Sequence, residues 1–371
     1  KFQSKNPTAR KRAVVQRSRI LFLCRKGMGA LSGQVEIMTA INHSEIESNQ
    51  RYIIFGGAGF IGSHLVRHLR NKGVKEIVVA DISEDIYPRY PDVTYRKCDV
   101  REKIPSDLVS GPAVVINLAA IHRTPGHEDH EYFDTNVKGA RNVVDFCERT
   151  GSKTLWFTSS ISVYGPSEEP LDESAELNPE SAYGMSKREA EIIHKEWCAK
   201  DPQRKLLIAR PAVVFGAREN GNFTRLAKAL KKGLFVFPGR TDTVKGCGYV
   251  EDLIGSFFFM QEQPERFIIY NFCYPKPYTI EDICAAFVKV AHFRRPLGTF
   301  PLSLMLKITK VFQVLDRLGL HNGIHPERVY KLVRSTNIVP GELIRRRYPY
   351  KTDLEEGLRR WLEDEPNGRF V

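Results

Sequence analysis

The sequence predicts an α/β protein in which a doubly wound parallel sheet is followed by a smaller, mainly helical lobe. Three observations support this class. Short β-branched runs alternate with stretches of helical periodicity from residue 52 onward. A glycine-rich turn joins the first run to the first helical stretch, and the alternation weakens after Phe215. Strands that alternate with helices form parallel sheets with right-handed crossovers, so we expect helices on both faces of one sheet.

The strand candidates are short and rich in apolar and β-branched side chains, and they cover residues 52–55, 76–80, 93–98, 113–118, 154–158, 206–209 and 267–271. Helical periodicity separates them over residues 60–71, 136–149 and 181–199, and it returns over 222–233. Near the end of the chain, helical spacing predicts a helix docked on the core through Leu354, Leu358, Trp361 and Leu362. Parallel sheets bind ligands beyond the carboxyl ends of their strands, so a functional site is expected at that edge.

These patterns divide the chain into an extension, a sheet domain and a lobe. Residues 1–50 form a basic extension that we expect to be disordered. Residues 51–217 form the nucleotide-binding domain, to which residues 245–275 return with the last strand. Residues 218–244 and 276–371 form the lobe, which we expect to cover the strand ends and contact the substrate.

Most of the net charge of +12 lies in the N-terminal extension. Residues 1–35 contain nine lysines and arginines and no aspartate or glutamate, which leaves +3 for the rest of the chain. Because the remainder is nearly balanced, we expect no nucleic-acid partner. In composition the extension resembles an organelle transit peptide, and a disordered extension explains it equally well. Its one apolar run, residues 20–24, is shorter than a secretory signal requires.

The cysteines and the longest apolar stretch indicate which cellular compartment and which cofactors to expect. Seven cysteines are scattered without the spacing of a metal site, so we expect a reducing, cytoplasmic location, no disulfides and no metal. Residues 296–320 form the longest apolar stretch, but four charged residues interrupt it, which excludes a transmembrane helix. An amphipathic helix there either packs on the core, which we favour, or makes a peripheral contact with a membrane.

A glycine-rich turn follows the first strand candidate, with glycines at positions 56, 57, 59 and 62. The spacing Gly56-x-x-Gly59-x-x-Gly62 lets backbone N–H groups approach a pyrophosphate at the start of a helix. Asp81 closes the second strand about 20 residues later, where an acid accepts hydrogen bonds from an adenosine ribose and repels a 2′-phosphate. The glycine turn and Asp81 together favour NAD over NADP, although glycine clusters and strand-terminal aspartates also occur in ordinary turns.

Two further strand ends face the same crevice. Asp99 and Val100 end the third strand, and the run Asn117-Leu118-Ala119-Ala120 ends the fourth. The small side chains of the two alanines would let a cofactor lie against the backbone.

A hydroxyl-rich strand end and a tyrosine–lysine pair carry the predicted chemistry. Residues 157–165 read Phe-Thr-Ser-Ser-Ile-Ser-Val-Tyr-Gly, and Tyr183 and Lys187 lie one turn apart on a predicted helix. An ammonium group and a positive nicotinamide would lower the phenol pKa from about 10 toward neutral pH. The tyrosinate could then take a proton from a substrate alcohol as hydride leaves. An exposed helix face is the simpler explanation of the pair alone, but the glycine turn and the serines outweigh it.

Together these motifs resemble the extended short-chain dehydrogenase/reductase superfamily, and within it the NAD-dependent epimerase/dehydratase family, over residues 51–363. The matching segments, besides the glycine turn and Asp81, are Cys98-Asp-Val100, Asn117-Leu-Ala-Ala120, Asn136-Val-Lys-Gly139, Ser159-Ser-Ile-Ser-Val-Tyr-Gly165, Tyr183-x-x-x-Lys187, Ala209-Arg-Pro211 and Tyr249-Val-Glu-Asp252. The resemblance implies a Rossmann-type fold and an enzyme that uses NAD.

The resemblance also implies roles for single residues. Ser160 would hydrogen-bond the reacting hydroxyl, Tyr183 would act as the base, and Lys187 would bind the nicotinamide ribose and tune the tyrosine. Contacts with NAD are implied for Gly56, Gly59, Phe60, Ile61, Gly62, Asp81, Asp99, Val100, Leu118, Ala119, Ala120, Asn136, Tyr183, Lys187 and Pro211. Family dimers usually pair through helices like those over 136–149 and 181–199, which implies a homodimer.

Departures from the family pattern reduce the number of reactions that this chain is expected to catalyse. Sugar dehydratases and decarboxylases of the superfamily carry an acid where this chain has Ile161 and Ser162, so elimination and decarboxylation are disfavoured. Val213 replaces an asparagine that often holds a sugar nucleotide, and Lys245-Gly-Cys-Gly replaces a usual Arg-Asp-Phe. Basic residues that could grip a diphosphate instead are Lys245, Arg218, Arg225 and Arg240, although a solvated surface position is the simpler explanation of each one alone.

Three functional hypotheses follow from these residues. The first is an NAD-dependent epimerase that acts on a nucleotide-linked sugar through a transient keto intermediate. The second is a 3β-hydroxysteroid dehydrogenase-like oxidoreductase acting on a sterol or lipid alcohol, because the Arg210–Gly216 run and the apolar 301–320 segment also resemble such enzymes. The third is a non-catalytic NAD-binding or nucleic-acid-binding module, which the intact Tyr183 and Lys187 disfavour.

Overall fold

The computed structural model describes residues 50–84, 88–123, 126–317, 326–365 and 370. The extension predicted over residues 1–50 therefore lies, apart from Gln50, outside the described residues. Seven parallel strands form the central sheet in the order β11-β7-β5-β4-β1-β2-β3. They are β1 (Arg51–Phe55), β2 (Glu76–Asp81), β3 (Thr94–Lys97), β4 (Val114–Asn117), β5 (Thr154–Thr158), β7 (Lys205–Pro211) and β11 (Phe267–Phe272). Each of the seven predicted strands is confirmed as a strand of this sheet.

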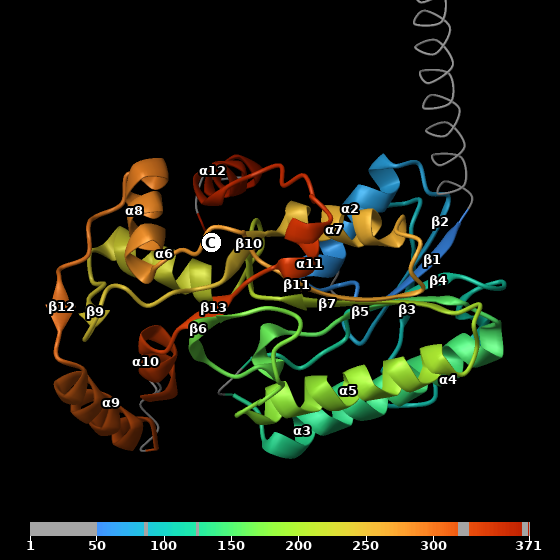
Figure 1. The fold of residues 1–371 in the computed structure, drawn as a ribbon, viewed down its shortest axis with the longest axis horizontal. Coiled ribbons are helices and arrows are strands. Elements are labelled where there is room, and N and C mark those ends of the chain that lie inside the picture. Colours follow the sequence, from blue (N-terminus) through green and yellow to red (C-terminus); the bar gives the residue numbers. More distant parts are fainter. Residues whose placement is uncertain (1–49, 85–87, 124–125, 318–325, 366–369, 371) are drawn as a thin grey trace, which may run out of the picture.

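Helices cover both faces of the sheet, as the alternating pattern predicts (Figure 1). One face carries α2 (Phe60–Asn71) and α7 (Val250–Gln261), and the other carries α3 (Asp129–Phe133), α4 (Gly139–Thr150) and α5 (Ala182–Ala199). Successive residues of β1 alternate between the two cores: Tyr52 and Ile54 pack on one side, Ile53 and Phe55 on the other. The predicted 136–149 helix divides into a π-helical turn, η2 (Asp134–Lys138), and α4.

The lobe continues the core of one sheet face. Its helices are α6 (Asn222–Lys232), α8 (Ile280–Ala291), α9 (Leu302–Arg317), α10 (Pro326–Val333), α11 (Gly341–Arg345) and α12 (Leu354–Asp364). Leu354, Leu358 and Trp361 of α12 are buried in the same cluster as Tyr52 and Ile54 of the sheet, which confirms the predicted docking of the last helix. None of the described helices has the length and hydropathy that crossing a membrane requires.

Short strand pairs and 3₁₀ turns complete the chain. The pairs are β6 (Ser167–Leu171) with β13 (Thr336–Ile338), β8 (Val213–Phe215) with β10 (Cys247–Tyr249), and β9 (Phe237–Pro238) with β12 (Thr299–Phe300). The turns are η1 (Ser106–Leu108) and η3 (Ile161–Val163). The β6–β13 pair joins the lobe to the segment that follows β5, and the β8–β10 pair joins two segments of the nucleotide-binding domain.

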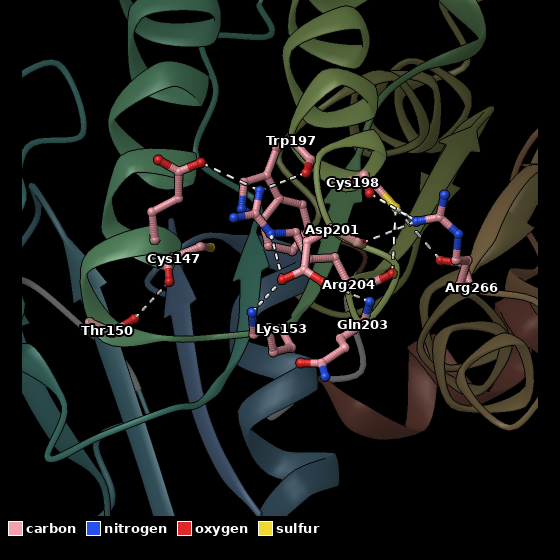
Figure 2. A network of polar contacts seen from close by, with 10 residues as sticks. Cys147, Thr150, Lys153, Trp197, Cys198, Asp201, Gln203, Arg204 and Arg266 are labelled. Carbon is pink, nitrogen blue, oxygen red and sulfur yellow. Dashed lines mark hydrogen bonds and ion pairs between the residues drawn. The ribbon is translucent and has the colours of Figure 1, made fainter.

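The amino edge of the sheet is closed by polar contacts between the ends of α4 and α5 and the starts of β5, β7 and β11 (Figure 2). Lys153 forms an ion pair with Asp201 at 2.5 Å. Arg204 donates to the backbone oxygen of Trp197 at 2.7 Å, and Arg266 donates to that of Cys198 at 2.9 Å. These contacts fill the edge opposite to the one where a ligand site is expected.

The six described cysteines are all buried and free: Cys98, Cys147, Cys198, Cys247, Cys273 and Cys284. Burial raises the pKa of Cys98 to about 11 and that of Cys284 to about 12. A thiol is reactive as its thiolate, so these side chains act as packing groups in the folded chain.

Candidate active site

The glycine turn after β1 leaves a backbone cradle that side chains would fill. Gly56 has a φ of 76°, and a Cβ on it would lie 2.6 Å from the backbone nitrogen of Ala119. A Cβ on Gly62 would lie 2.6 Å from the Cα of Gly57, so only glycine permits this approach of helix and turn. α2 begins after Gly59, and no side chain caps it. Its first N–H groups therefore point from an uncapped helix end, where an anion is favoured.

Asp81 lies beside this turn, as the sequence predicts. Its Oδ2 accepts a hydrogen bond from the backbone nitrogen of Ala58 at 3.0 Å, and its Oδ1 accepts one from Ser83 at 2.9 Å. A carboxylate has about four acceptor positions, so both oxygens retain capacity for ribose hydroxyls.

Asn136 and Asp99 lie near the crevice but interact with protein groups. Asn136 is buried, where its Oδ1 accepts from the backbone of Ile121 at 3.1 Å and its Nδ2 donates to Ser186 at 2.9 Å. It thus fixes the loop after β4 against α5, and it sits in the π-helical turn η2. Asp99 pairs with Arg101 at 2.6 Å, and this hydrogen bond lowers the pKa of Asp99.

The other predicted cofactor contacts lie at carboxyl ends of strands or at the start of α2. Phe60 and Ile61 are half-buried in the first turn of α2, and Val100 is buried against Gly139. Leu118, Ala119 and Ala120 are half-buried just after β4, and Pro211 ends β7.

These features fit a dinucleotide. The uncapped start of α2 and the glycine cradle would hold the pyrophosphate, Asp81 would hold the adenosine ribose, and the loop 118–120 would border the cofactor. Among the described residues, no group of three histidine, cysteine or carboxylate side chains is arranged to hold a metal ion.

Ser160 and Tyr183 meet at the carboxyl end of β5. Ser160 precedes η3 in extended conformation, and its Oγ accepts a hydrogen bond from the nitrogen of Ser162 at 3.1 Å. Tyr183 is half-buried in the first turn of α5, whose start is capped by Ser181. Burial raises the pKa of Tyr183 to about 12, and a hydrogen bond with Ser160 acts in the opposite direction.

Lys187 lies on the same helix face, one turn beyond Tyr183, with 2% of its surface exposed. Its Nζ donates to the backbone oxygen of Thr158 at 2.8 Å and lies 4.8 Å from the ring centre of Phe157. Burial lowers the pKa of Lys187 to about 7, against the opposing charge of Glu191. The structure thus brings Ser160, Tyr183 and Lys187 together at one strand end.

The protein groups by themselves do not lower the pKa of Tyr183, whereas the sequence-based expectation combined the lysine with a positive nicotinamide. Desolvation of the phenolate outweighs the stabilising contacts, so the protein groups alone raise the pKa. A phenolate at neutral pH would need further positive charge beside Tyr183, such as the oxidised nicotinamide ring carries.

The sequence analysis missed a buried ion pair behind these residues. Glu191 and Arg210 are 1% and 3% exposed and share two hydrogen bonds of 2.7 and 2.8 Å. Glu191 also accepts from Ser159 at 2.7 Å, and Arg210 donates to Tyr164 at 2.7 Å. Burial alone would raise the pKa of Glu191, but Arg210 holds it below its usual value. The signal was present in the sequence, because Glu191 continues the four-residue spacing of Tyr183 and Lys187.

Two of the basic residues proposed to grip a diphosphate have other partners. Lys245 donates to the backbone oxygens of Lys331 and Arg334 at the end of α10, and burial lowers the pKa of Lys245 to about 8. Arg240 pairs with Asp242 and Glu168. Backbone carbonyls at the end of α10 therefore engage the ammonium group of Lys245, for which the sequence left open a diphosphate contact or a solvated surface.

His122, in the loop after β4, is a further titratable group near the site that the sequence analysis did not single out. Burial lowers the pKa of His122, and the charges of Arg123 and Lys187 add to that effect. An imidazole kept neutral near Lys187 can accept or donate a hydrogen bond without adding charge.

Comparisons with known proteins agree with this geometry. The model of the NAD dependent epimerase/dehydratase family matches residues 52–273. The N-acetyl-α-D-glucosaminyl-diphospho-ditrans,octacis-undecaprenol 4-epimerase of Escherichia coli O157:H7 is 28% identical over 321 residues, 85% of this chain and 96% of its own. The UDP-glucose 4-epimerase of Streptococcus mutans serotype c is 31% identical over 179 residues, 46% of this chain and 54% of its own. The structure of MoeE5 in complex with UDP-glucuronic acid and NAD superposes with a TM-score of 0.67 at 22% identity, covering 84% of this chain and 98% of that one.

Proposed function

Because the chain belongs to the NAD-dependent epimerase/dehydratase family, we propose that it is an epimerase that inverts one carbon of a nucleotide-linked sugar. The observation that carries this proposal is the meeting of Ser160, Tyr183 and Lys187 at the carboxyl end of β5, beside the glycine cradle. Such a cluster can remove a proton from a sugar hydroxyl and return it.

The proposed mechanism assigns proton transfer to the protein. Bound NAD would supply the acceptor and later the donor of hydride. The Tyr183 oxygen would take the proton of the sugar hydroxyl while Ser160 holds that hydroxyl by a hydrogen bond. Lys187, fixed by the oxygen of Thr158, would place its positive charge near the phenol and the nicotinamide ribose. Rotation of the keto sugar in the pocket, return of hydride to the opposite face of its carbonyl carbon and return of the proton from Tyr183 to its oxygen would give the epimer.

The residues between the catalytic serine and η3 favour epimerisation over elimination. Ile161 is buried and Ser162 bonds back to Ser160 through its nitrogen, so neither position offers a carboxylate. Loss of water from the sugar would need an acid or base for the second proton. The keto sugar is therefore expected to react mainly by taking hydride back.

A second candidate differs only in the group that carries the sugar diphosphate. The E. coli relative, whose name specifies an undecaprenol-linked substrate, aligns across the lobe, whereas the Streptococcus UDP-glucose 4-epimerase aligns over 54% of its length. A sugar joined by diphosphate to a polyprenyl lipid is thus a rival to the nucleotide-linked sugar. Both substrates share the sugar diphosphate on which the proposed chemistry acts.

The test measures epimer formation with each carrier. Purified protein is incubated with UDP-glucose, UDP-N-acetylglucosamine or N-acetylglucosaminyl diphosphoundecaprenol, and the released sugars are separated by chromatography. We expect interconversion of 4-epimers without net NADH. Tyr183→Phe should lower kcat by about 10²–10⁴-fold while NAD binding persists.

The matched control is Tyr330→Phe, which removes a phenol hydroxyl from a side chain that is 47% exposed on α10, outside the proposed site. It should keep kcat within a few-fold of the wild type. Stoichiometric NADH from a sterol, with no sugar epimer, would replace the proposal by the dehydrogenase alternative.

We also propose that the chain forms a homodimer through α4 and α5 and works in a reducing, cytoplasmic compartment. The supporting observations are the exposed apolar side chains of Met185 and Ile192 on α5 and the free thiols of the six described cysteines. Analytical ultracentrifugation of the wild type and Ile192→Glu tests the dimer, because a buried new charge would weaken it.

A further inference from the structure

One end of the lobe carries four exposed aliphatic side chains. Leu234 and Leu297 are 68% and 70% exposed, and Leu304 and Ile308 of α9 are 46% and 41% exposed. Single exposed leucines are common, but several on one surface mark an interaction site. These four residues are called the apolar patch below.

Backbone contacts bring the segments that carry the apolar patch next to one another. The nitrogen of Leu297 donates to the oxygen of Phe235 at 2.9 Å, which places Leu297 beside the residue that follows Leu234. The β9–β12 pair continues this contact toward α9, because Leu302 at the start of α9 lies 3.2 Å from the position of a Cβ on Gly239. Figure 1 shows β9, β12 and α9 following one another at the end of the molecule opposite to β2.

Over residues 302–309, where its side chains are described, α9 packs on the lobe with one face. The inner positions are buried or half-buried: Leu302, Met305, Leu306 and Thr309. The outer positions are exposed: Ser303, Leu304, Lys307 and Ile308. The helix is amphipathic, as the sequence predicts, and over its described side chains it packs on the lobe with one face while Leu304 and Ile308 repeat on the outer face one turn apart.

The surroundings of the apolar patch are strongly basic. Residues 223–241 and 292–315, which contain the patch, include nine lysines and arginines and no aspartate or glutamate. Five of these cations are exposed and, within the described part of the chain, take part in no ion pair: Lys231, Lys232, Arg294, Arg295 and Lys307. A Cβ on Gly233 would lie 2.6 Å from the Cδ of Arg294, so the end of α6 and the 294–297 segment are adjacent.

We propose that this end of the lobe docks on an anionic lipid membrane, with the apolar patch among the headgroups and the five cations on lipid phosphates. A nucleic acid is a poorer match, because the exposed apolar side chains are aliphatic and bases stack on aromatic rings. A second copy is also a poorer match, because it would bring two positive surfaces together. The inference goes beyond the proposed function, and it holds for either sugar carrier.

The experiment measures binding of the full chain to vesicles by co-sedimentation. The vesicles contain phosphatidylcholine alone or with about one-third phosphatidylglycerol, so that only the second kind is anionic. We expect the wild type to bind the anionic vesicles, and binding to fall at least about tenfold in Leu304→Glu/Ile308→Glu. Arg294→Gln/Arg295→Gln should weaken binding to anionic vesicles most at low salt, where charge attraction is least screened.

The matched control is Phe267→Glu/Ile344→Glu. It adds the same two charges at positions that are 42% and 47% exposed but lie on β11 and α11. The control should bind like the wild type, and the basic extension is present in every variant, so its contribution cancels. Circular dichroism and NAD binding verify that each variant is folded.

Three results would overturn the proposal. The first is equal vesicle binding by the wild type and Leu304→Glu/Ile308→Glu. The second is loss of self-association in that variant, which would assign the patch to a second copy. The third is stronger retention on RNA than on anionic vesicles at the same salt. None of these readouts depends on turnover, so failure here is distinct from failure of the epimerase assignment.

Discussion

At the scale of single residues, Lys187 is an ionisable side chain that is almost completely buried. Its pKa is lowered to about 7 in the folded chain, against 10.5 as the ordinary value. Between these two pH values the unfolded chain binds a proton that the folded chain does not. The free energy of unfolding therefore contains a term from Lys187 that rises with pH across this window.

Replacing Lys187 by methionine should remove that term. The difference in free energy of unfolding between the wild type and Lys187→Met should grow in favour of the wild type from pH about 7 to about 10. Urea unfolding at several pH values measures it. Lys200→Met, at the exposed C-terminal end of α5, is the control for the loss of a lysine from the same helix. Parallel pH curves for the wild type and Lys187→Met would show that burial does not shift the lysine.

At the scale of elements, the glycine turn between β1 and α2 is defined by backbone proximity. Gly56 and Gly73 both have a φ of 76°, but a Cβ on Gly56 meets the backbone of Ala119 while a Cβ on Gly73 meets nothing within 4 Å. The two positions therefore share the same backbone strain and differ only in the space available. They form a natural pair for separating strain from steric exclusion.

Gly73→Ala should lower the free energy of unfolding by about 1–2 kcal/mol, the cost of a left-handed non-glycine residue, and leave NAD affinity unchanged. Gly56→Ala should cost more and weaken NAD binding at least about tenfold, because the β4 loop must move. Urea denaturation and calorimetric titration with NAD measure both effects. Equal losses of stability and affinity for the two variants would contradict the role of the Ala119 contact.

Which elements could be predicted depends on how far each pattern extends. The seven strands of the sheet were predictable because each is a buried apolar run bounded by turns, and α2 was predictable because its apolar positions keep one face over three turns. The two-residue strands β9 and β12 were not, since their pairing is decided by tertiary contacts rather than by a periodic pattern. Sequence spacing also gave no sign of the π-helical turn at Asn136, which depends on that side chain reaching Ile121 and Ser186.

At the scale of the whole molecule, one buried polar chain joins the site to the lobe. Glu191 of α5 pairs with Arg210 of β7, which donates to Tyr164, and Tyr164 donates to Asn271 of β11 at 2.8 Å. Asn271 donates in turn to the backbone oxygen of Val339 in the lobe at 3.0 Å. This chain of hydrogen bonds connects the backbone at Val339 with the serines that end β5, through Ser159.

Breaking this chain at Arg210 should be costly. Arg210→Met leaves the Glu191 carboxylate buried without its main partner, and we expect a loss of about 3–5 kcal/mol of unfolding free energy. Arg334→Met, which breaks the exposed pair with Glu180, should cost at most about 1 kcal/mol. Urea titrations of the two variants provide the comparison. A loss for Arg210→Met as small as that for Arg334→Met would mean that Glu191 is protonated or hydrated.

The candidate site was predictable in its parts because each part is a local motif: the glycine turn, Asp81, the serines and the Tyr183–Lys187 pair. The electrostatics of the site were not predictable, because the pKa of Tyr183 depends on how strongly folding desolvates the phenol. The partners of Lys245 were not predictable for a similar reason, because these backbone oxygens at the end of α10 come from a distant segment.

The burial of the six described cysteines has a practical consequence for handling this protein. With their sulfurs enclosed in the cores on both faces of the sheet, alkylating reagents and mild oxidants gain access to these six only when the packing around them opens. The rate at which these cysteines are labelled therefore reports opening of the fold, and no new cysteine has to be introduced for the measurement.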